Sequence, residues 1–529
     1  MSITLNRLPS LPTSFYPEDA LGRPSGNLAG FITGVRRVAL ESSPTLIACV
    51  LVNLVVLCYV FTFLSTKNVI PTVGYPHWLG SYSGVLRFLI DSKSMVDEGY
   101  RKYKGGFFRI PLVTNWTYII ANPKCIDEMY HLPEEVLSLR FAAADELQLP
   151  YTMGQQLHDN PYHLPILRSK LTRHIDFLVG ECLDEMTKAM DETLGKELNS
   201  FDTFTTIIAR TFNRILVGAP TCRSKDYTDV CKAFAVNTGV VGFIINLFPS
   251  ILRPVVGRLI TQLPSLTRRT LFHLEPVIKE RRAAMAEYGS NWPEKPMDML
   301  MWLMEAAEGI EKEPERLAVR ILVLNIATIH STATSVIQGL NCLMENIEYA
   351  DPLREEAESA LRTHGWTKHA INQLVKTDSF LKEASRLNAI GITSFPRKAL
   401  RDITFSDGTT VPKGAYISSP FAIHYDEEFY PDPLKFDGFR HVQDTGNRAN
   451  NSSGMIRTNA HYLIFGHGKY PWEAQSLTPV PQPGRFIATY MMKATMAYLL
   501  THYDVKFGAQ GRLPNIVFQY NHSPNMRAT

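Results

Sequence analysis

The chain has 529 residues, of which 45% are hydrophobic, 10% aromatic and 20% charged. This composition is typical of a folded globular protein and excludes a disordered one. Lysine and arginine (54) exceed aspartate and glutamate (51) by only 3, so the bulk charge predicts no nucleic-acid partner. The length exceeds that of a usual single core, so we expect several domains or one unusually large domain with room to enclose a ligand.

The cysteines carry no pattern of a metal or disulfide framework. Seven cysteines, at positions 49, 58, 125, 182, 222, 231 and 342, form no CxxC pair and no zinc-finger spacing. We therefore predict reduced, mostly buried thiols in a reducing compartment. No cysteine follows Cys342.

Residues 45–64 (TLIACVLVNLVVLCYVFTFL) form an uncharged apolar run. Its length matches a bilayer core, and its insertion is favourable by about 4–8 kcal/mol as an upper estimate. We predict a transmembrane helix here rather than a buried core helix. The mostly polar lead at residues 1–44 argues against a cleaved signal peptide. The flanking charges, Arg36 and Arg37 before the run and Lys67 after it, are nearly balanced, so they do not predict a topology.

Residues 65–76 contain Pro71, Gly74 and Pro76, which end helices and stiffen the chain. We expect a hinge there, followed by one large domain at residues 77–529, since no Pro- or Ser-rich linker divides that stretch. Its periodicity predicts long helices near 167–196, 203–217, 226–246, 265–288, 295–308, 315–346 and 351–364. Shorter strand-like segments lie near 107–121, 388–397, 402–405 and 415–419. The expected fold class is mainly α with small β-sheets.

Several motifs follow one another in the C-terminal third. Glu383 and Arg386 are three residues apart, so they share a helix face and can form a charge-assisted pair, although such pairs are common on solvated helices. Then come His424-Tyr425-Asp426, Tyr430-Pro431-Asp432-Pro433, Phe436-Asp437-Gly438-Phe439-Arg440 and Phe465-Gly466-His467-Gly468-Lys469. The last of these is not a phosphate loop, because Tyr470 follows Lys469 and no glycine stands five positions before Gly468.

In this order and spacing the motifs resemble those of the heme-thiolate monooxygenases, the cytochromes P-450. The resemblance implies the cytochrome P-450 fold with an N-terminal anchor helix. It implies that Glu383, Arg386 and Arg440 form a structural triad that supports the proximal side of heme b. It also assigns cofactor binding to Arg397, Phe465, Gly468 and Arg485.

A second stretch, Ala327-Thr328-Ile329-His330-Ser331-Thr332, lies in the middle of a predicted long helix and is similar to the family's distal helix. Splitting bound dioxygen consumes two protons, so a hydroxyl and a titratable group are needed there. The resemblance implies catalytic roles for His330, Ser331 and Thr332. By itself, a histidine among Ile, Leu and Val is more often a satisfied core residue, but its register with the other motifs makes a catalytic role about equally favoured, so both interpretations stay open. The resemblance also predicts a pocket lined by Thr393, Ser394, Phe395 and the face around Ile329 and Ala333.

The chain departs from the family at one place. The family pattern Phe-x-x-Gly-x-x-x-Cys-x-Gly puts the iron's axial cysteine at 472 when counted from Phe465, and at 482 when counted back from Pro483. This chain has Trp472 and Gln482, so the segment from Trp472 to Gln482 replaces one cysteine, and we predict no metal ligand of this chain. Indole and amide groups cannot act as the thiolate that favours O–O cleavage. His467 is the nearest alternative ligand in the sequence.

Three interpretations follow from this departure. The sequence is a misjoined version of an active enzyme, a catalytically inactive pseudoenzyme or splice isoform without the heme-thiolate cysteine, or a membrane-anchored scaffold. The clean return of the motif at Pro483-Gly484-Arg485-Phe486 favours the first.

The resemblance also implies a substrate class, partners and a location. Phe212-Asn213-Arg214, Val217-Gly218 and Cys222-Arg223 look like a fungal subgroup that includes ent-kaurene oxidase and other terpenoid-tailoring enzymes. The expected activity is hydroxylation or multistep oxidation of an apolar secondary metabolite. Its electrons would come from NADPH through NADPH-cytochrome P-450 reductase. A single-pass location in the endoplasmic reticulum membrane is expected, with the body in the cytosol.

Overall fold

The computed structural model describes residues 3–5, 70–73, 80–112, 115–194, 197–442, 454–467, 484–508 and 511–525. The predicted anchor at 45–64, most of the hinge at 65–76, Gly468 and the segment from Trp472 to Gln482 lie outside the described residues. The boundaries of these segments therefore remain predictions.

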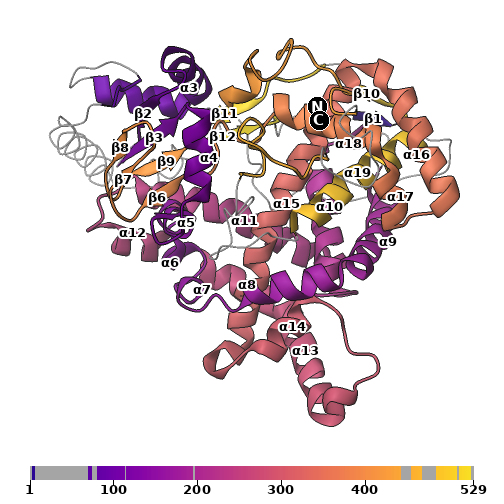
Figure 1. Cartoon of the computed structure of the whole chain (residues 1–529). Helices are drawn as coiled ribbons and strands as arrows, with labels where there is room; N and C mark the ends of the chain where they lie inside the picture. Colours follow the sequence, from indigo (N-terminus) through magenta and orange to yellow (C-terminus); the bar gives the residue numbers. More distant parts are fainter. Residues whose placement is uncertain are drawn as a thin grey trace.

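Helices make up most of the described chain (Figure 1). The longer ones are α3 (Gly80–Lys102), α4 (Pro123–His131), α5 (Leu139–Glu146), α9 (Ile175–Thr193), α10 (Ser200–Leu216), α11 (Lys225–Asn246), α12 (Arg253–Ile260), α13 (Leu263–Tyr288), α14 (Met299–Ala306), α15 (Pro314–Glu345), α16 (Ala350–His364), α18 (Val375–Leu387) and α19 (Gly484–His502). Short helices are α6 (Leu149–Thr152), α7 (Gln156–Asp159), α8 (His163–Ile166) and α17 (Lys368–Gln373).

The central element is α15, which packs against α10, α11, α13, α18 and α19. It begins with Pro314 in its first turn, where the missing N–H of proline has no helical partner to lose. Most of its side chains are buried on every side, which is the pattern of a helix inside a large core. The main hydrophobic core therefore surrounds α15.

Two described helices, α11 and α15, are long and apolar enough to cross a membrane. Within their apolar windows, 44% of α11 and 67% of α15 is buried in the body. Packing inside a core accounts for this apolar character, so these two helices are weak evidence of a membrane span.

The largest sheet has the strand order β2-β3-β9-β6-β4 and is antiparallel except for the parallel pair β3–β9. Figure 1 shows it beside α3, at one side of the molecule. Its strands are β2 (Phe107–Pro111), β3 (Trp116–Ile120), β4 (Leu137–Ser138), β6 (Arg397–Ala399) and β9 (Tyr416–Ser418). Small sheets are formed by β1 (Ile3–Leu5), β5 (Glu197–Leu198) and β10 (Val505–Phe507), by β7 (Ile403–Thr404) and β8 (Thr410–Val411), and by β11 (Ile516–Phe518) and β12 (Asn521–Ser523).

The predicted fold class, mainly α with small sheets, is confirmed. The predicted helices match the structure closely, except that residues 167–196 are divided: a π-helical turn at Leu167–Leu171 precedes α9. The strand predicted at 388–397 is wrong, because only Arg397 belongs to a strand. The rest pairs through isolated bridges at Gly391 and Thr393.

The contact between α3 and β2 requires a glycine. Gly99 is buried, and a Cβ at this position would lie 2.4 Å from the ring of the fully buried Phe108. Gly99→Ala should therefore lower the free energy of unfolding by about 1–3 kcal/mol, measured by urea unfolding of the purified protein in detergent. Gly180→Ala is the matched control, since Gly180 is an exposed position of α9 with nothing within 4 Å of the added methyl group. It should stabilise by about 0.5–1 kcal/mol, and equal effects of the two substitutions would contradict the packing argument.

Candidate active site

A buried ionic network joins α18 to the loop that follows β9. Arg386 donates from Nε to Glu383 Oε2 at 2.8 Å and from Nη2 to Oε1 at 2.7 Å, and Arg440 Nε donates to the same Oε1 at 3.0 Å. Neither Glu383 nor Arg386 exposes any surface. Spacing and resemblance predicted these three partners, and the structure brings them together. Their role beneath a heme remains a prediction.

The two arginines also hold the backbone of the loop. Arg386 Nη1 donates to the carbonyl of His424, and Arg440 Nη1 donates to that of Pro431 at 2.6 Å. Burial by itself would raise the pKa of Glu383. Hydrogen bonds from Arg386 and His441, with the charges of Arg386 and Arg440, outweigh it and lower the pKa to about 2. Glu383 is thus an ionised carboxylate that fastens the loop to the helix.

The three residues predicted to be catalytic lie on α15 but point in different directions. His330 Nε2 donates to the carbonyl of Lys232 at 3.3 Å, and its ring stacks on Phe201 with centroids 6.0 Å apart. Ser331 donates to the carbonyl of Ala327 at 2.8 Å, one turn back on its own helix. The Thr332 hydroxyl is buried and has no hydrogen-bond partner in the structure.

One face of α15 is less tightly covered than the rest. Thr328, Ser331 and Ser335 are half-buried, as are several apolar neighbours between residues 324 and 327, whereas Ile329 and Ala333 are buried. Their spacing puts them on a single face. A small, polar, incompletely packed face on a central helix is a suitable wall for a bound group.

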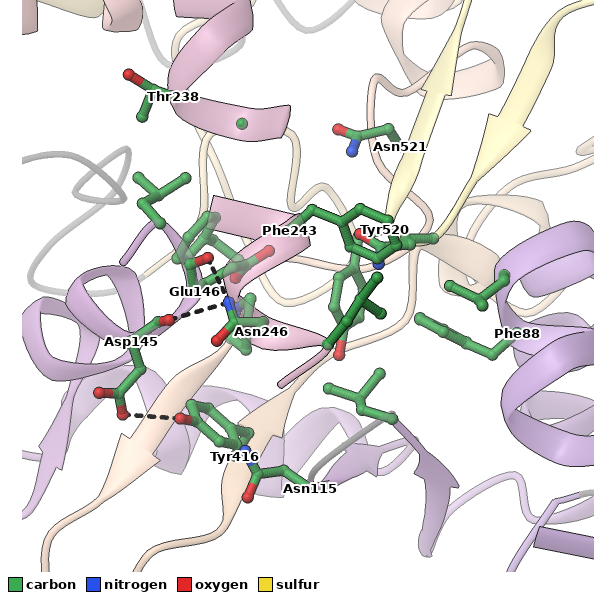
Figure 2. A pocket seen from close by; sticks show the side chains of 18 of the residues that line it. Phe88, Asn115, Asp145, Glu146, Thr238, Phe243, Asn246, Tyr416, Tyr520 and Asn521 are labelled. Carbon is green, nitrogen blue, oxygen red and sulfur yellow. Dashed lines mark hydrogen bonds between the residues drawn. The ribbon is translucent and has the colours of Figure 1, made fainter. Parts of the chain in front are cut away.

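A cavity of about 340 Å³ lies between α3, α5, α11 and the sheet (Figure 2). Its apolar lining includes Phe88, Leu112, Phe243, Ile326 and Phe395. Polar side chains reach it from several elements, as the close view shows: Asn115, Asp145, Glu146, Thr238, Asn246, Tyr416, Tyr520 and Asn521. The arrangement can hold an apolar molecule and orient it by a few polar contacts.

Only part of the predicted pocket lining is found. Phe395 lines this cavity, as predicted, but Thr393 and Ser394 are buried outside it, where Ser394 exchanges hydrogen bonds with Ser418 and Ser419. Ile329 and Ala333 do not line this cavity, so their place in the substrate pocket remains a prediction.

Both side chains are fully buried in the main core cluster. Each lies two residues from Ser331, about 200° around the helix, and so on the opposite face. Ile326 is the α15 residue that reaches the cavity.

Sequence reasoning missed the cavity residues of α5, α11 and the C-terminal strands, among them Glu146, Thr238 and Tyr520. No sequence signal distinguishes Glu146 from an ordinary solvated acid in the run Asp145-Glu146.

The residues predicted to bind the cofactor include a buried cation. Arg397 is only 3% exposed, and among the described residues its side chain has one partner, the Tyr130 ring, 4.9 Å from the guanidinium carbon. Arg485, at the start of α19, is half-buried, its Nε has no hydrogen-bond partner among the described residues, and burial lowers its pKa. Cations with so few partners in the described part of the chain suit an anionic group such as a porphyrin carboxylate. Phe465 is buried in the core, and Gly468 lies outside the described residues.

The donor set for the iron does not fit. All five described cysteines are free and buried, as predicted, and burial raises the pKa of Cys222, Cys231 and Cys342 to about 12, so they are thiols at neutral pH. The chain has no later cysteine than Cys342. His467, the alternative in the sequence, contacts Asp127 of α4 through Nε2 at 3.0 Å. The residues present thus suit the porphyrin's carboxylates but supply no thiolate for its iron.

Replacing Glu383 tests the ionic network. Glu383→Gln should cost about 3–5 kcal/mol at pH 7, because it leaves two buried guanidinium groups without their carboxylate. The folded pKa of Glu383, about 2, lies below its ordinary 4.5. Its contribution is therefore complete above pH 4.5 and is lost as the pH falls towards 2, so the gap between wild type and variant should narrow over that range. Unfolding free energies at pH 7, 5, 4 and 3 measure this.

Asp184→Asn is the control for that experiment, because its pair with Lys188 on α9 is about half exposed. This substitution should change stability by less than about 1 kcal/mol. Equal losses in the two variants, or a gap independent of pH, would contradict the role of the network.

Comparisons with known proteins agree with this geometry. The cytochrome P450 family model matches residues 91–522. Cytochrome P450 monooxygenase 71 of Postia placenta is 34% identical over 465 residues, which cover 86% of this chain and 91% of that protein. Ent-kaurene oxidase P450-4 of Gibberella fujikuroi is 31% identical over 493 residues, covering 89% and 94%. The solved structure of retinoic acid bound cyanobacterial CYP120A1 has the same fold, with a TM-score of 0.61, 18% identity, and coverage of 86% of this chain and 97% of that chain. By resemblance to fungal monooxygenases, the chain is a heme-dependent monooxygenase. It therefore belongs to the cytochrome P450 family.

Proposed function

We propose that the protein is a membrane-anchored P450 monooxygenase that oxidises an apolar secondary metabolite of the terpenoid class. We further propose that the form with residues 472–482 in place of the axial cysteine is a misjoined version of that enzyme. The observation that carries the first proposal is the cavity of about 340 Å³ with its largely apolar lining. The likeness to a protein named ent-kaurene oxidase supports the substrate class.

The reaction would insert one atom of dioxygen into a C–H bond and reduce the other to water, with two electrons and two protons. NADPH would supply the electrons through NADPH-cytochrome P-450 reductase, and heme b bound through a cysteine would activate the oxygen. The chain with residues 472–482 lacks that cysteine, so no oxygenation step is assigned to it. The predicted anchor at 45–64 supports a single-pass location in the endoplasmic reticulum membrane, where an apolar substrate dissolves.

A second candidate function, that of an inactive pseudoenzyme, rests on the missing axial cysteine. If residues 472–482 belong to the mature protein, the chain is an inactive pseudoenzyme that keeps the fold and the cavity. The clean return of the family motif at Pro483-Gly484-Arg485-Phe486 favours the misjoined version instead. The network of Glu383, Arg386 and Arg440 supports the fold in either case, because losing one partner of a buried ion pair is strongly destabilising.

Restoring the sulfur tests the assignment of the axial position. A variant in which a single cysteine replaces residues 472–482 should bind heme and give a thiolate-type Soret band with carbon monoxide, whereas the written chain should not. The matched control replaces the same residues by a single alanine, which restores the loop length without the sulfur. Absorption spectra of the three purified proteins measure this. A thiolate-type band in the written chain, or none in the cysteine variant, would refute the assignment.

The second test asks which form exists in native membranes. Trypsin cleaves after Lys469 and Arg485, so the written form should release the peptide Tyr470–Arg485, which contains Trp472. The corrected form should release a much shorter peptide with a cysteine. Mass spectrometry of microsomes with the native activity should find the short peptide. Finding only the long one would defeat the misjoined version.

A further inference from the structure

Among the described residues that line the apolar cavity, one carboxyl group has no hydrogen-bond or ion-pair partner in the described part of the chain. Glu146 is the last residue of α5, and its side chain lines the cavity described above (Figure 2). Its backbone carbonyl accepts a hydrogen bond from Asn246 Nδ2 at 2.8 Å. In the described part of the chain, its carboxyl group has neither a hydrogen bond nor an ion pair.

The neighbouring acid shows the contrast. Asp145 accepts hydrogen bonds from Lys398 Nζ and, at 2.8 Å, from the Tyr416 hydroxyl, which Figure 2 marks. Asp145 is therefore a satisfied structural ion, and Glu146 is not. Burial raises the pKa of Glu146 to about 7, and a carboxylate at the carboxyl end of a helix is also disfavoured by the helix dipole. Near neutral pH a large share of Glu146 is thus a neutral acid that can donate its O–H.

A second polar group in the cavity wall also lacks a partner. Thr238 of α11 is 1% exposed, and its hydroxyl makes no hydrogen bond in the structure. Buried polar groups are satisfied in most folded proteins, so two unsatisfied groups on one cavity require an explanation. The Glu146 carboxyl group is able to bond a neutral oxygen atom of a ligand, whereas the Thr238 hydroxyl is buried within the cavity wall.

We propose that Glu146 is the polar anchor of the cavity and that the ligand is an apolar molecule carrying a carbonyl oxygen, to which the Glu146 carboxyl group donates. This inference rests on the proposed function, because it names the chemistry of the molecule that the enzyme would hold. A neutral oxygen suits the site better than an ammonium group, since an ammonium group loses several kcal/mol of hydration on burial. A carbonyl has a far smaller desolvation cost, which one hydrogen bond offsets.

The other charged and titratable groups around the cavity do not replace Glu146 in this role. Asp145 is paired with Lys398, and Arg253 of α12 donates from Nε to the carbonyl of Phe248 at 3.0 Å. Burial is the largest cause that raises the pKa of Tyr416 and Tyr520, so both stay neutral. The residues that α3 and α15 contribute to the lining are uncharged. The group that should change charge between pH 6 and pH 8.5 is therefore Glu146.

A matched pair of ligands isolates this hydrogen bond. Equilibrium dialysis of the purified full chain in detergent would measure the affinities of trans-2-decalone and trans-decalin, which differ by the carbonyl oxygen. At pH 6 the ketone should bind the wild type about threefold to tenfold better, relative to the hydrocarbon and after correction for their partition into detergent. This preference should disappear at pH 8.5, because the ionised carboxylate cannot donate.

Two substitutions complete the test. E146Q keeps a donor that does not titrate, so it should retain the ketone preference at both pH values. E146L keeps the volume without a donor and should lose the preference at both. Trans-2-aminodecalin serves as the cationic probe of the same titration: it should bind the wild type better at pH 8.5, where Glu146 is ionised, than at pH 6, and E146L should lose this difference.

The outcomes separate this inference from the proposed function. Equal ketone preference in wild type and E146L, or amine binding that does not change with pH, would overturn the anchor and leave a cavity for apolar ligands. If neither decalone nor decalin bound the chain, the apolar cavity itself would be refuted as a ligand site, and with it both the anchor and the substrate class of the proposed function. The pH profile of the wild type needs no variant, so a folding defect in either substitution would not leave the question open.

Discussion

The fully buried carboxylate of Glu383 is the interaction on which the described architecture depends. Removing a charge from water costs several kcal/mol, and only a complete set of partners offsets it. Arg386 and Arg440 provide that set, and their remaining N–H groups bind carbonyls of the loop at 424–440. The carboxylate thereby fixes the position of an irregular segment relative to α18 without a regular sheet or helix to hold it.

Further hydrogen bonds and an ion pair connect this loop and α18 to the chain on both sides of residues 472–482. The loop's His424 accepts a hydrogen bond from the backbone N–H of Leu463 at 3.0 Å, two residues before Phe465. On α18, Asp378 binds the backbone N–H of Met455 at 2.7 Å and pairs with Lys493 of α19 at 3.3 Å. The supports before Trp472 and after Gln482 are thus intact, while the sulfur they would serve is absent. A single local replacement at residues 472–482 accounts for this combination.

The sequence was sufficient for the features that repeat or have fixed spacing. The period of apolar residues located α10, α11, α13 and α15, since each buries an extended face along its length. The partners of Glu383 followed from a three-residue helical spacing together with the order of the later motifs. Residues 388–397 were misjudged because their apolar pattern matches a strand, whereas strand formation needs a continuous partner that only isolated bridges supply. The cavity lining was largely missed because the sequence of α15 does not show which of its faces neighbouring elements cover and which face borders the cavity. Glu146 was missed because burial, which makes it unusual, comes from distant elements.

The contacts of α15 bear on the two interpretations of His330. A proton relay needs an imidazole that exchanges protons with the cavity, but burial lowers the pKa of His330 and thereby favours the neutral ring. Its Nε2 is engaged by the carbonyl of Lys232, and its ring stacks on Phe201. These contacts favour the satisfied core histidine. Ser331 lies on the half-buried face with Thr328 and Ser335, and its hydroxyl donates to the carbonyl of Ala327. Its catalytic role remains a prediction, because Ile326 is the α15 residue that lines the cavity.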